Sequence, residues 1–192
     1  DNVFEDVFAG VGSHSMIYDR PYRNIVIQGN TFRNVKKRAV WCLNYVDSAV
    51  EDNIIENAGG GVLVSCMYFP NTHLIPGTAA GMEGNHQNAG ISVKNNQISI
   101  SSVSQINGNI WRGYGIEVQG AWVSDSSKAQ AKGIPVGIYK ENGVAVKGNM
   151  ITGTGNGIRL YLADGCTVED NQLKLQKTAS FSNIGIYLSA SS

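Results

Sequence analysis

A short phrase recurs along this chain: an apolar residue, a polar residue, then Gly, Asp or Asn, and then Asn. The full copies read VIQGNTF at 26–32, VEDNII at 50–55, VKNNQI at 93–98, VKGNMI at 146–151 and VEDNQL at 168–173. Asp1-Asn2-Val3-Phe4 reads as the end of one more copy. A phrase that returns at a steady interval indicates a protein built from stacked repeats.

The interval between copies is close to 22 residues. The last Asn of the phrase returns after 23 residues between Asn30 and Asn53, and after 22 between Asn149 and Asn171. The other intervals are 28, 43 and 53 residues. They correspond to one unit plus insertions of about 5, 20 and 30 residues. The chain therefore predicts about six units of about 22 residues, three of them enlarged.

A second phrase, Gly-apolar-x-apolar, lies between the copies of the first. It occurs at Gly61-Val62-Leu63-Val64, Gly115-Ile116-Glu117-Val118, Gly157-Ile158-Arg159-Leu160 and Gly185-Ile186-Tyr187-Leu188, and with Ala first at Ala39-Val40-Trp41-Cys42. Val40 precedes Asn53 by 13 residues, and Ile158 precedes Asn171 by the same number. The two phrases therefore keep one register and belong to one repeat.

Both phrases alternate apolar and polar residues with a period of two, which is typical of β-strands. No helical spacing is sustained, and 23 glycines disfavour helix interiors. Equivalent positions carry the same class of side chain: Val26, Val50, Val93, Val146 and Val168 in one column, and Val40, Val62, Ile116, Ile158 and Ile186 in another. Like-on-like stacking favours parallel strands over a sandwich of hairpins, which needs regularly spaced turns.

The two phrases and their register resemble the right-handed parallel β-helix of the pectin-lyase-like superfamily, over nearly the whole chain. The resemblance implies three strands per coil: Gly-apolar-x-apolar, then the Val before Asn, then the apolar residue after Asn. It also implies a tight turn of stacked asparagines, where Gly and Asn tolerate left-handed backbone. We expect an all-β, single-stranded right-handed parallel β-helix, with these structural asparagines: Asn30, Asn53, Asn96, Asn149 and Asn171.

Composition limits the function classes. The 192 residues predict a single domain, 1–192. A formal net charge of zero gives no basic excess for nucleic acid, and no apolar run reaches the length of a membrane helix. We expect no signal peptide within these residues. Because the chain starts within an Asn phrase and ends on Gly185-Ile186-Tyr187-Leu188-Ser189-Ala190-Ser191-Ser192, we expect a segment of a longer solenoid.

The three cysteines lack the spacing of a metal site. Cys42 and Cys166 fall at inward positions, which predicts small core residues. Cys66 follows Val64 by two and is compatible with an inward position as well. A disulfide requires two of them to stack within reach, which spacing leaves open.

Insertions indicate where function sits, because the repeat does not need them. They cover about 65–87, 99–114 and 119–141. By the family mapping they flank the outward face of the first strand, where members of the family hold extended sugar chains. We expect a ligand groove there. The alternative is that the insertions are variable surface loops.

The outward positions of the first strand form an unusual series: Trp41, Leu63, Glu117, Arg159 and Tyr187. Sugar rings stack on Trp and Tyr, and Arg grips a carboxylate bidentately. The competing interpretation is an exposed salt bridge between Glu117 and Arg159, worth under about 1 kcal/mol. The predicted substrate-binding residues are Trp41, Tyr187, Tyr161, Trp122, Trp111 and His86.

Two cleavage chemistries occur on this fold in the family. A lyase uses a basic side chain to take the proton next to a uronate carboxylate, which Arg159 with Lys132 or Lys140 would supply; Glu117 with Asp125 would hold calcium. A hydrolase uses two carboxylates, for which Glu117 would pair with Asp125 or Glu83. The catalytic candidates are therefore Glu117, Arg159, Asp125 and Lys132. Because Glu117 has no stacked acidic neighbour, no metal site is assigned, and calcium enters only through the lyase alternative.

The paired acids of the repeated turn, Glu51-Asp52 and Glu169-Asp170, stand where other copies have Lys94-Asn95 and Lys147-Gly148. Free exchange of charge is typical of exposed turn residues, so we do not expect catalysts there.

The function predicted from these residues is an extracellular or cell-surface carbohydrate-active domain that binds a polysaccharide and, in the enzyme alternative, cleaves it. The competing class is a non-catalytic β-helix scaffold, such as a surface adhesin or a segment of a phage tail spike. Aromatic platforms favour binding, whereas an acidic cluster beside Lys or Arg favours an enzyme. Oligomeric state and substrate identity are not determined by the sequence.

Overall fold

The computed structural model describes residues 1–13, 22–65, 90–101, 104–106, 109–111, 113–123, 137–178 and 183–189. At 104–106, 109–111, 121–123 and 137–139 it describes the backbone alone. Every element in these ranges is a β-strand, and no helix is present among them. The described part of the chain is therefore all-β, as the alternation predicts.

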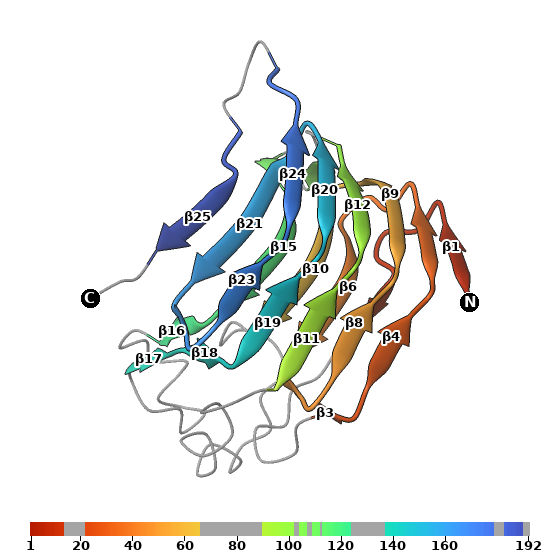
Figure 1. Ribbon diagram of the computed structural model, residues 1–192. Coiled ribbons are helices and arrows are strands. Elements are labelled where there is room, and N and C mark those ends of the chain that lie inside the picture. Colours follow the sequence, from red (N-terminus) through yellow and green to blue (C-terminus); the bar gives the residue numbers. More distant parts are fainter. Residues whose placement is uncertain are drawn as a thin grey trace.

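Most strands belong to three parallel sheets (Figure 1). Sheet 1 contains β2 (Val11–Gly12), β6 (Arg38–Leu43), β10 (Gly60–Ser65), β15 (Tyr114–Gln119), β21 (Asn156–Tyr161) and β25 (Ile186–Ser189). Sheet 2 contains β4 (Val26–Gln28), β8 (Ala49–Glu51), β11 (Ile91–Lys94), β19 (Val144–Lys147) and β23 (Thr167–Glu169). Sheet 3 contains β1 (Val3–Glu5), β5 (Thr31–Arg33), β9 (Ile54–Ala58), β12 (Gln97–Ile100), β20 (Met150–Gly153) and β24 (Gln172–Leu175).

The chain passes through sheets 1, 2 and 3 in turn and then returns to sheet 1. Each strand therefore pairs with its counterpart in the next repeat rather than with its neighbour in sequence. Parallel neighbours joined by long connections are what a stacked repeat requires. The arrangement is compatible with a parallel β-helix.

Four two-stranded sheets lie beside these three sheets in the described residues. Two are parallel: β3 (Tyr22–Arg23) with β7 (Tyr45–Val46), and β18 (Glu141–Asn142) with β22 (Ala163–Asp164). Two are antiparallel: β13 (Ser104–Ile106) with β14 (Asn109–Trp111), and β16 (Ala121–Val123) with β17 (Gly137–Tyr139). The antiparallel pairs lie within the predicted insertions at 99–114 and 119–141, where the repeat is interrupted.

The core consists of stacked columns of apolar side chains. One column of sheet 1 holds Val40, Val62, Ile116 and Ile158, all nearly free of solvent contact. Sheet 3 contributes Phe32, Ile55, Ile98 and Ile151, with Phe4 stacked on Phe32 at 4.8 Å between ring centres. Burial of each such side chain contributes about 1.5–3 kcal/mol, so the columns supply most of the stability.

The sheet 2 column corrects one prediction. Val26 was expected to stack under Val50, but the structure pairs Ile27 with Val50 and Val26 with Ala49. Ile27 is 5% exposed and Val26 is 63% exposed. Ile27, like Val50, stands three residues before the ladder Asn, so the fixed distance to that Asn determines which residue points inward.

Cys42 is buried in the core, as predicted, and stacks on Val64. Burial raises the pKa of its thiol above the ordinary value. Cys166 is half-buried and packs against the core. Both are free thiols. Cys66 lies outside the described residues.

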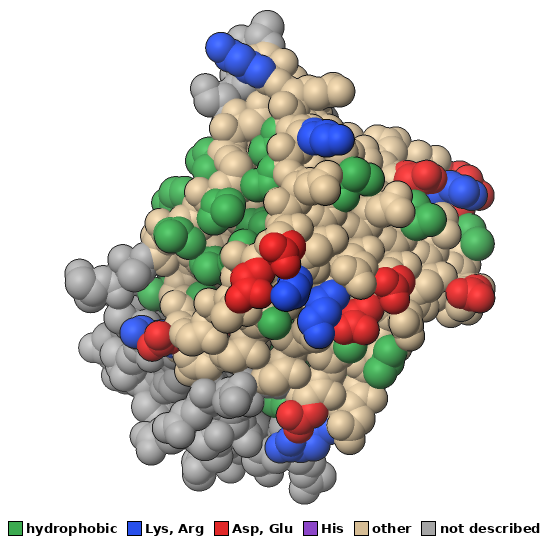
Figure 2. All heavy atoms as spheres, in the orientation of Figure 1, with side chains coloured by type: hydrophobic (Ala, Val, Ile, Leu, Met, Phe, Trp, Pro, Cys, Tyr) green, Lys and Arg blue, Asp and Glu red, His purple; other side chains and the backbone are tan. Residues whose placement is uncertain are grey.

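On the outer face of sheet 2, two lysines on neighbouring strands lie between acidic side chains of the flanking strands (Figure 2). Lys94 lies 3.9 Å from Glu51, and Lys147 lies 3.3 Å from Glu169 and 3.5 Å from Asp170. The Glu169 carboxylate raises the pKa of Lys147 by hydrogen bonding and by charge. These acids therefore make surface ion pairs between repeats, as expected of turn residues.

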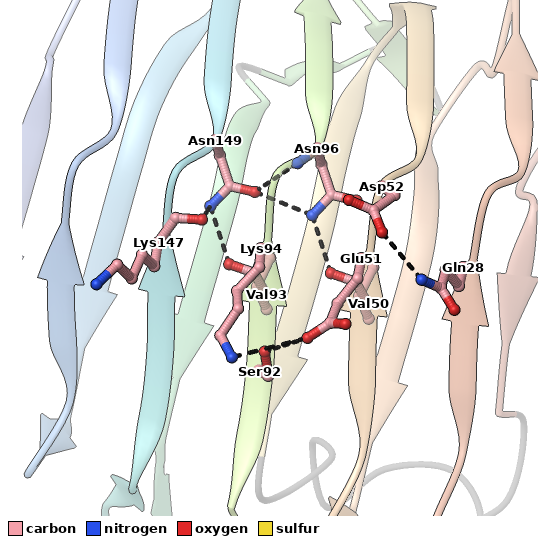
Figure 3. A network of polar contacts seen from close by, with 10 residues as sticks. All are labelled: Gln28, Val50, Glu51, Asp52, Ser92, Val93, Lys94, Asn96, Lys147 and Asn149. Carbon is pink, nitrogen blue, oxygen red and sulfur yellow. Dashed lines mark hydrogen bonds and ion pairs between the residues drawn. The ribbon is translucent and has the colours of Figure 1, made fainter.

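The asparagines form a continuous ladder along the molecule, of which Figure 3 shows the step between Asn96 and Asn149. Asn53 and Asn96 each donate from the backbone and from the side-chain amide to Oδ1 of the next Asn, at 2.9–3.0 Å. The Asn96 amide also donates to the carbonyl of Val50 at 2.9 Å. Asn2 joins the ladder by donating to Asn30, so it is one more copy of the phrase, as predicted.

The residue before each ladder Asn from Asn30 to Asn171 has a positive φ. The values lie between 53° and 67° at Gly29, Asp52, Asn95, Gly148 and Asp170. Gly, Asn and Asp tolerate this left-handed region, which explains the Gly/Asp/Asn-Asn part of the phrase.

The glycine that begins the second phrase is required for a steric reason rather than for a positive φ. A Cβ at Gly61 would lie 2.1 Å from the carbonyl oxygen of Gly115 and 2.9 Å from Ile98. A Cβ at Gly115 would lie 2.6 Å from Ile151. Sheet 1 approaches the core side chains of sheet 3 too closely at this corner for a larger residue.

Candidate functional site

The five outward residues of sheet 1 lie in one register row. Trp41 pairs with Leu63, Leu63 with Glu117, Glu117 with Arg159, and Arg159 with Tyr187. They point away from the core because the residues on either side of each, such as Val62 and Val64, point into it. The alternation therefore brings these side chains together as expected, although their role as a binding or catalytic row stays a prediction.

Glu117 is the centre of a buried ion-pair bridge. Its Oε1 accepts a hydrogen bond from Nη1 of Arg159 at 2.7 Å, and its Oε2 accepts one from Nη2 of Arg38. The Glu117 side chain is 4% exposed, against 14% for Arg38 and 26% for Arg159. The bridge is thus shielded from solvent, unlike the exposed pair considered from the sequence.

Arg38 was missed by sequence reasoning. It is 79 residues from Glu117 and reaches it across β10, where the ladder partner of Arg38 is Gly60. Because Gly60 has no side chain, it does not block the Arg38 side chain between β6 and Glu117 on β15. Burial lowers the pKa of Arg38, and the Glu117 carboxylate opposes that effect. The sequence marks Arg38 only by its place directly before Ala39-Val40-Trp41-Cys42, the copy of the second phrase that begins with Ala.

Tyrosine rings surround the Arg159 guanidinium. Its carbon lies 4.7 Å from the ring centre of Tyr161, 5.7 Å from that of Tyr114 and 6.0 Å from that of Tyr187. A guanidinium within about 6 Å of aromatic faces gains cation–π attraction. Tyr161 and Tyr187, both predicted binding residues, therefore contact the same cation.

A second cation lies at the other end of the row. Nζ of Lys37 is 4.3 Å from the ring centre of Trp41 and 5.8 Å from that of Phe8. Burial lowers the pKa of Lys37, and the neighbouring Arg38 charge lowers it further. Lys37 was also missed, because it precedes the phrase and no periodic position marks it.

The resulting surface, which we call the sheet 1 patch, is cationic and aromatic. It comprises Lys37, Arg38, Trp41, Tyr114, Glu117, Arg159, Tyr161 and Tyr187. Among these side chains three cations accompany one carboxylate, although the whole chain has a net charge of zero. Among the described residues, Trp41 Nε1 and Arg159 Nε are buried donors without a hydrogen-bond partner. Unpaired buried donors are uncommon and favour an acceptor supplied from outside.

Several predicted site residues cannot be placed in this patch. Asp125, Lys132 and His86 lie outside the described residues. Trp111 belongs to β14 and Trp122 to β16, whose backbones alone are described. The pairs Glu117–Asp125 and Arg159–Lys132 therefore stay predictions.

Metal binding finds no geometric support within the described ranges, where no three His, Cys, Asp or Glu side chains gather. Glu117 presents both carboxylate oxygens to guanidinium groups instead. In the same ranges no helix is long and apolar enough to cross a membrane.

Comparisons with protein-family models, with curated proteins and with solved structures found no match for this chain.

Proposed function

We propose that this chain is a carbohydrate-binding repeat domain that holds a polysaccharide along the outer face of sheet 1. The observation that carries the proposal is the sheet 1 patch: Trp41, Arg159 and Tyr187 lie in one register row, and the rings of Tyr114 and Tyr161 lie close to the Arg159 guanidinium. Aromatic faces stack on sugar rings, and arginine donates to hydroxyl and carboxylate oxygens.

The linear arrangement supports a polymeric ligand. Residues in register on neighbouring parallel strands repeat at about 4.8 Å, so the row from Trp41 to Tyr187 covers about 20 Å. A small metabolite fits a closed cavity, whereas an extended chain fits a row. A polysaccharide is outside most cells, so we propose an extracellular or cell-surface location.

Binding is proposed ahead of cleavage because of how Glu117 is held. A general acid or base must reach the substrate proton, and both oxygens of Glu117 accept hydrogen bonds from arginines. Glu117 therefore positions Arg38 and Arg159. Cleavage would require residues of the insertions, with Asp125 and Lys132 as the candidates.

The finer fold assignment belongs to the same proposal. We propose a right-handed, single-stranded parallel β-helix of about six coils, similar to the pectin-lyase-like superfamily. The three-sheet order, the Asn ladder and the positive φ before each ladder Asn support it.

A glycan array probed with the intact protein tests the proposal. The double variant Glu117→Ala/Arg159→Ala serves as the site control, and a depolymerisation assay on any bound glycan tests cleavage. We expect binding to at least one polysaccharide and its loss in the double variant. Binding that persists in that variant would show that the sheet 1 patch is not the binding site. Absence of any binding by the intact protein would favour a non-catalytic scaffold.

A further inference from the structure

Two places along the outward row of sheet 1 each hold a cation beside aromatic rings. At the first, Nζ of Lys37 lies 4.3 Å from the ring centre of Trp41. At the second, the guanidinium carbon of Arg159 lies 4.7 Å from the ring centre of Tyr161 and 5.7 Å from that of Tyr114. The row therefore contains two similar groups of side chains rather than a single centre.

The register of sheet 1 sets the distance between the two groups. Trp41 pairs with Leu63, Leu63 with Glu117, and Glu117 with Arg159, which makes three steps between neighbouring strands. Neighbouring strands lie about 4.8 Å apart, so the two groups are separated by about 14 Å. This span is longer than one sugar unit, so a ligand that contacts both groups must be a chain of several sugars.

Each group carries positive charge that the surrounding side chains leave unbalanced. Across the described ranges no carboxylate forms an ion pair with Lys37. Burial and the neighbouring Arg38 charge lower the pKa of its amine. Arg159 shares the single carboxylate of Glu117 with Arg38. An anion supplied by a ligand would offset the excess charge at either group.

Each group also contains a hydrogen-bond donor that lacks an acceptor. In the part of the chain that the structure describes, Trp41 Nε1 and Arg159 Nε are buried and make no hydrogen bond. Arg159 donates to Glu117 through Nη1, so its Nε is left for another acceptor. Unpaired buried donors are uncommon and costly, and an oxygen of a ligand would satisfy them.

The middle of the row is less suited to an acid group than the two groups that flank it. Leu63 is apolar and 7% exposed, so it offers no hydrogen bond. Both oxygens of Glu117 already accept hydrogen bonds from arginines, and its charge repels a second anion. Acid groups of a bound chain are therefore favoured at Lys37 and at Arg159.

We propose that the sheet 1 patch binds an acidic polysaccharide at two points, with one acid group at Lys37 and Trp41 and a second about 14 Å away at Arg159. This inference rests on the proposed carbohydrate-binding function and adds the chemical class of the ligand. Carboxylate and sulfate ester groups both accept charge-assisted hydrogen bonds, so the shared chemistry is an oxyanion carried by a sugar.

Matched polysaccharides test the requirement for charge. Dextran is neutral, dextran sulfate is the same chain with sulfate esters, and hyaluronan carries carboxylates as its acid groups. We expect dextran sulfate, hyaluronan or both to bind at least about tenfold more tightly than dextran at low salt, and less tightly as salt rises. Binding of one acidic polymer alone identifies the group that the patch recognises.

Single variants test the two points of contact. Lys37→Met and Arg159→Met each remove one cation and should each weaken binding of the acidic polymer at least about tenfold. Lys174→Met removes an exposed lysine from sheet 3, so it changes the net charge equally and should bind as the parent does. Circular dichroism checks each fold. Lys37→Met leaves the Arg38–Glu117–Arg159 bridge intact, so it tests the site even if Arg159→Met unfolds.

Ligand length tests whether both points are used at once. Fragments of the bound acidic polymer, graded by length, should gain affinity steeply once they span about 14 Å. Lys37→Met should lose this step, because only one point of contact remains. Equal gains with length in the parent and in Lys37→Met would overturn the two-point arrangement.

The outcomes separate this inference from the proposed function. Equal binding of dextran and the acidic polymers overturns the inference but leaves carbohydrate binding in place. Equal weakening by Lys37→Met and Lys174→Met overturns it too, because only net charge would then matter. Binding to a neutral glycan of the array, with none to the acidic polymers, has the same meaning. Absence of binding to every polysaccharide rejects the proposed function itself.

Discussion

The Asn ladder and the Arg38–Glu117–Arg159 bridge both remove polar side chains from water, but they do so in different ways. From Asn2 to Asn149, each ladder Asn donates to the Asn one repeat further on, and the geometry changes little from rung to rung. In the described part of the chain the bridge occurs once, joins Glu117 to residues 79 and 42 positions away, and leaves Arg159 Nε without a partner.

This difference distinguishes side chains that stabilise every repeat from side chains that are available to bind a ligand. A polar group that the fold needs in every repeat is repeated, and its hydrogen bonds are complete. A polar group that occurs once, on a face that the core does not require, is not explained by the repeat. The bridge and its aromatic neighbours are therefore the part of the described structure most suited to a ligand.

The largest effect is expected from breaking the ladder. Asn96→Ala removes the acceptor for the Asn53 backbone amide and the donor to the Val50 carbonyl. Two buried groups without partners cost roughly 2–6 kcal/mol in the free energy of unfolding. Urea denaturation measures this loss, and a change below about 1 kcal/mol would show that the ladder is dispensable.

A smaller effect is expected from breaking the bridge. Glu117→Leu leaves two guanidinium groups close together without their carboxylate and should cost about 2 kcal/mol, less than a fully buried pair because both arginines are partly exposed. The triple variant Arg38→Met/Glu117→Leu/Arg159→Met should recover most of that loss in the same denaturation assay. If the triple variant is as unstable as an Asn96 variant, the bridge is structural and the comparison fails.

Alkaline pH should weaken the core at Cys42. Because burial raises the pKa of the folded thiol above its ordinary 9.0, the stabilisation is complete below pH 9 and declines as pH rises beyond it. One unit above that value the loss attributable to Cys42 is about 1.4 kcal/mol. The Cys42→Val variant, which matches the stacked Val64, should lose correspondingly less stability between neutral and alkaline pH. Parallel losses in both proteins would contradict this assignment.

The smallest effect is expected on the outer face of sheet 2. Lys147→Ala removes exposed ion pairs with Glu169 and Asp170. Exposed ion pairs of this kind are screened by solvent and stabilise a protein very little, so thermal unfolding should change little. A loss as large as that of the bridge variant would mean that these turn charges stabilise the repeat.

The sequence predicts the repeated features best. The ladder and the inward columns depend on local alternation and on a fixed distance to Asn, so they could be predicted, apart from the one-residue shift at Val26. Arg38 could not be identified, because it reaches Glu117 across β10, where its ladder partner is Gly60. Lys37 could not be identified either, because it precedes the second phrase and no periodic position marks its contact with Trp41. The insertions carry no repeat, so no register relates their residues to the patch.

Equilibrium binding of a glycan identified on the array tests the central claim most directly. Arg159→Ala removes an arginine from the sheet 1 patch, and Arg33→Ala removes one from an exposed pair with Glu56 on sheet 3. Loss of a charge-assisted hydrogen bond predicts at least about tenfold weaker binding for Arg159→Ala. Arg33→Ala should bind as the parent does. Equal affinities of the two variants would contradict a binding site on sheet 1.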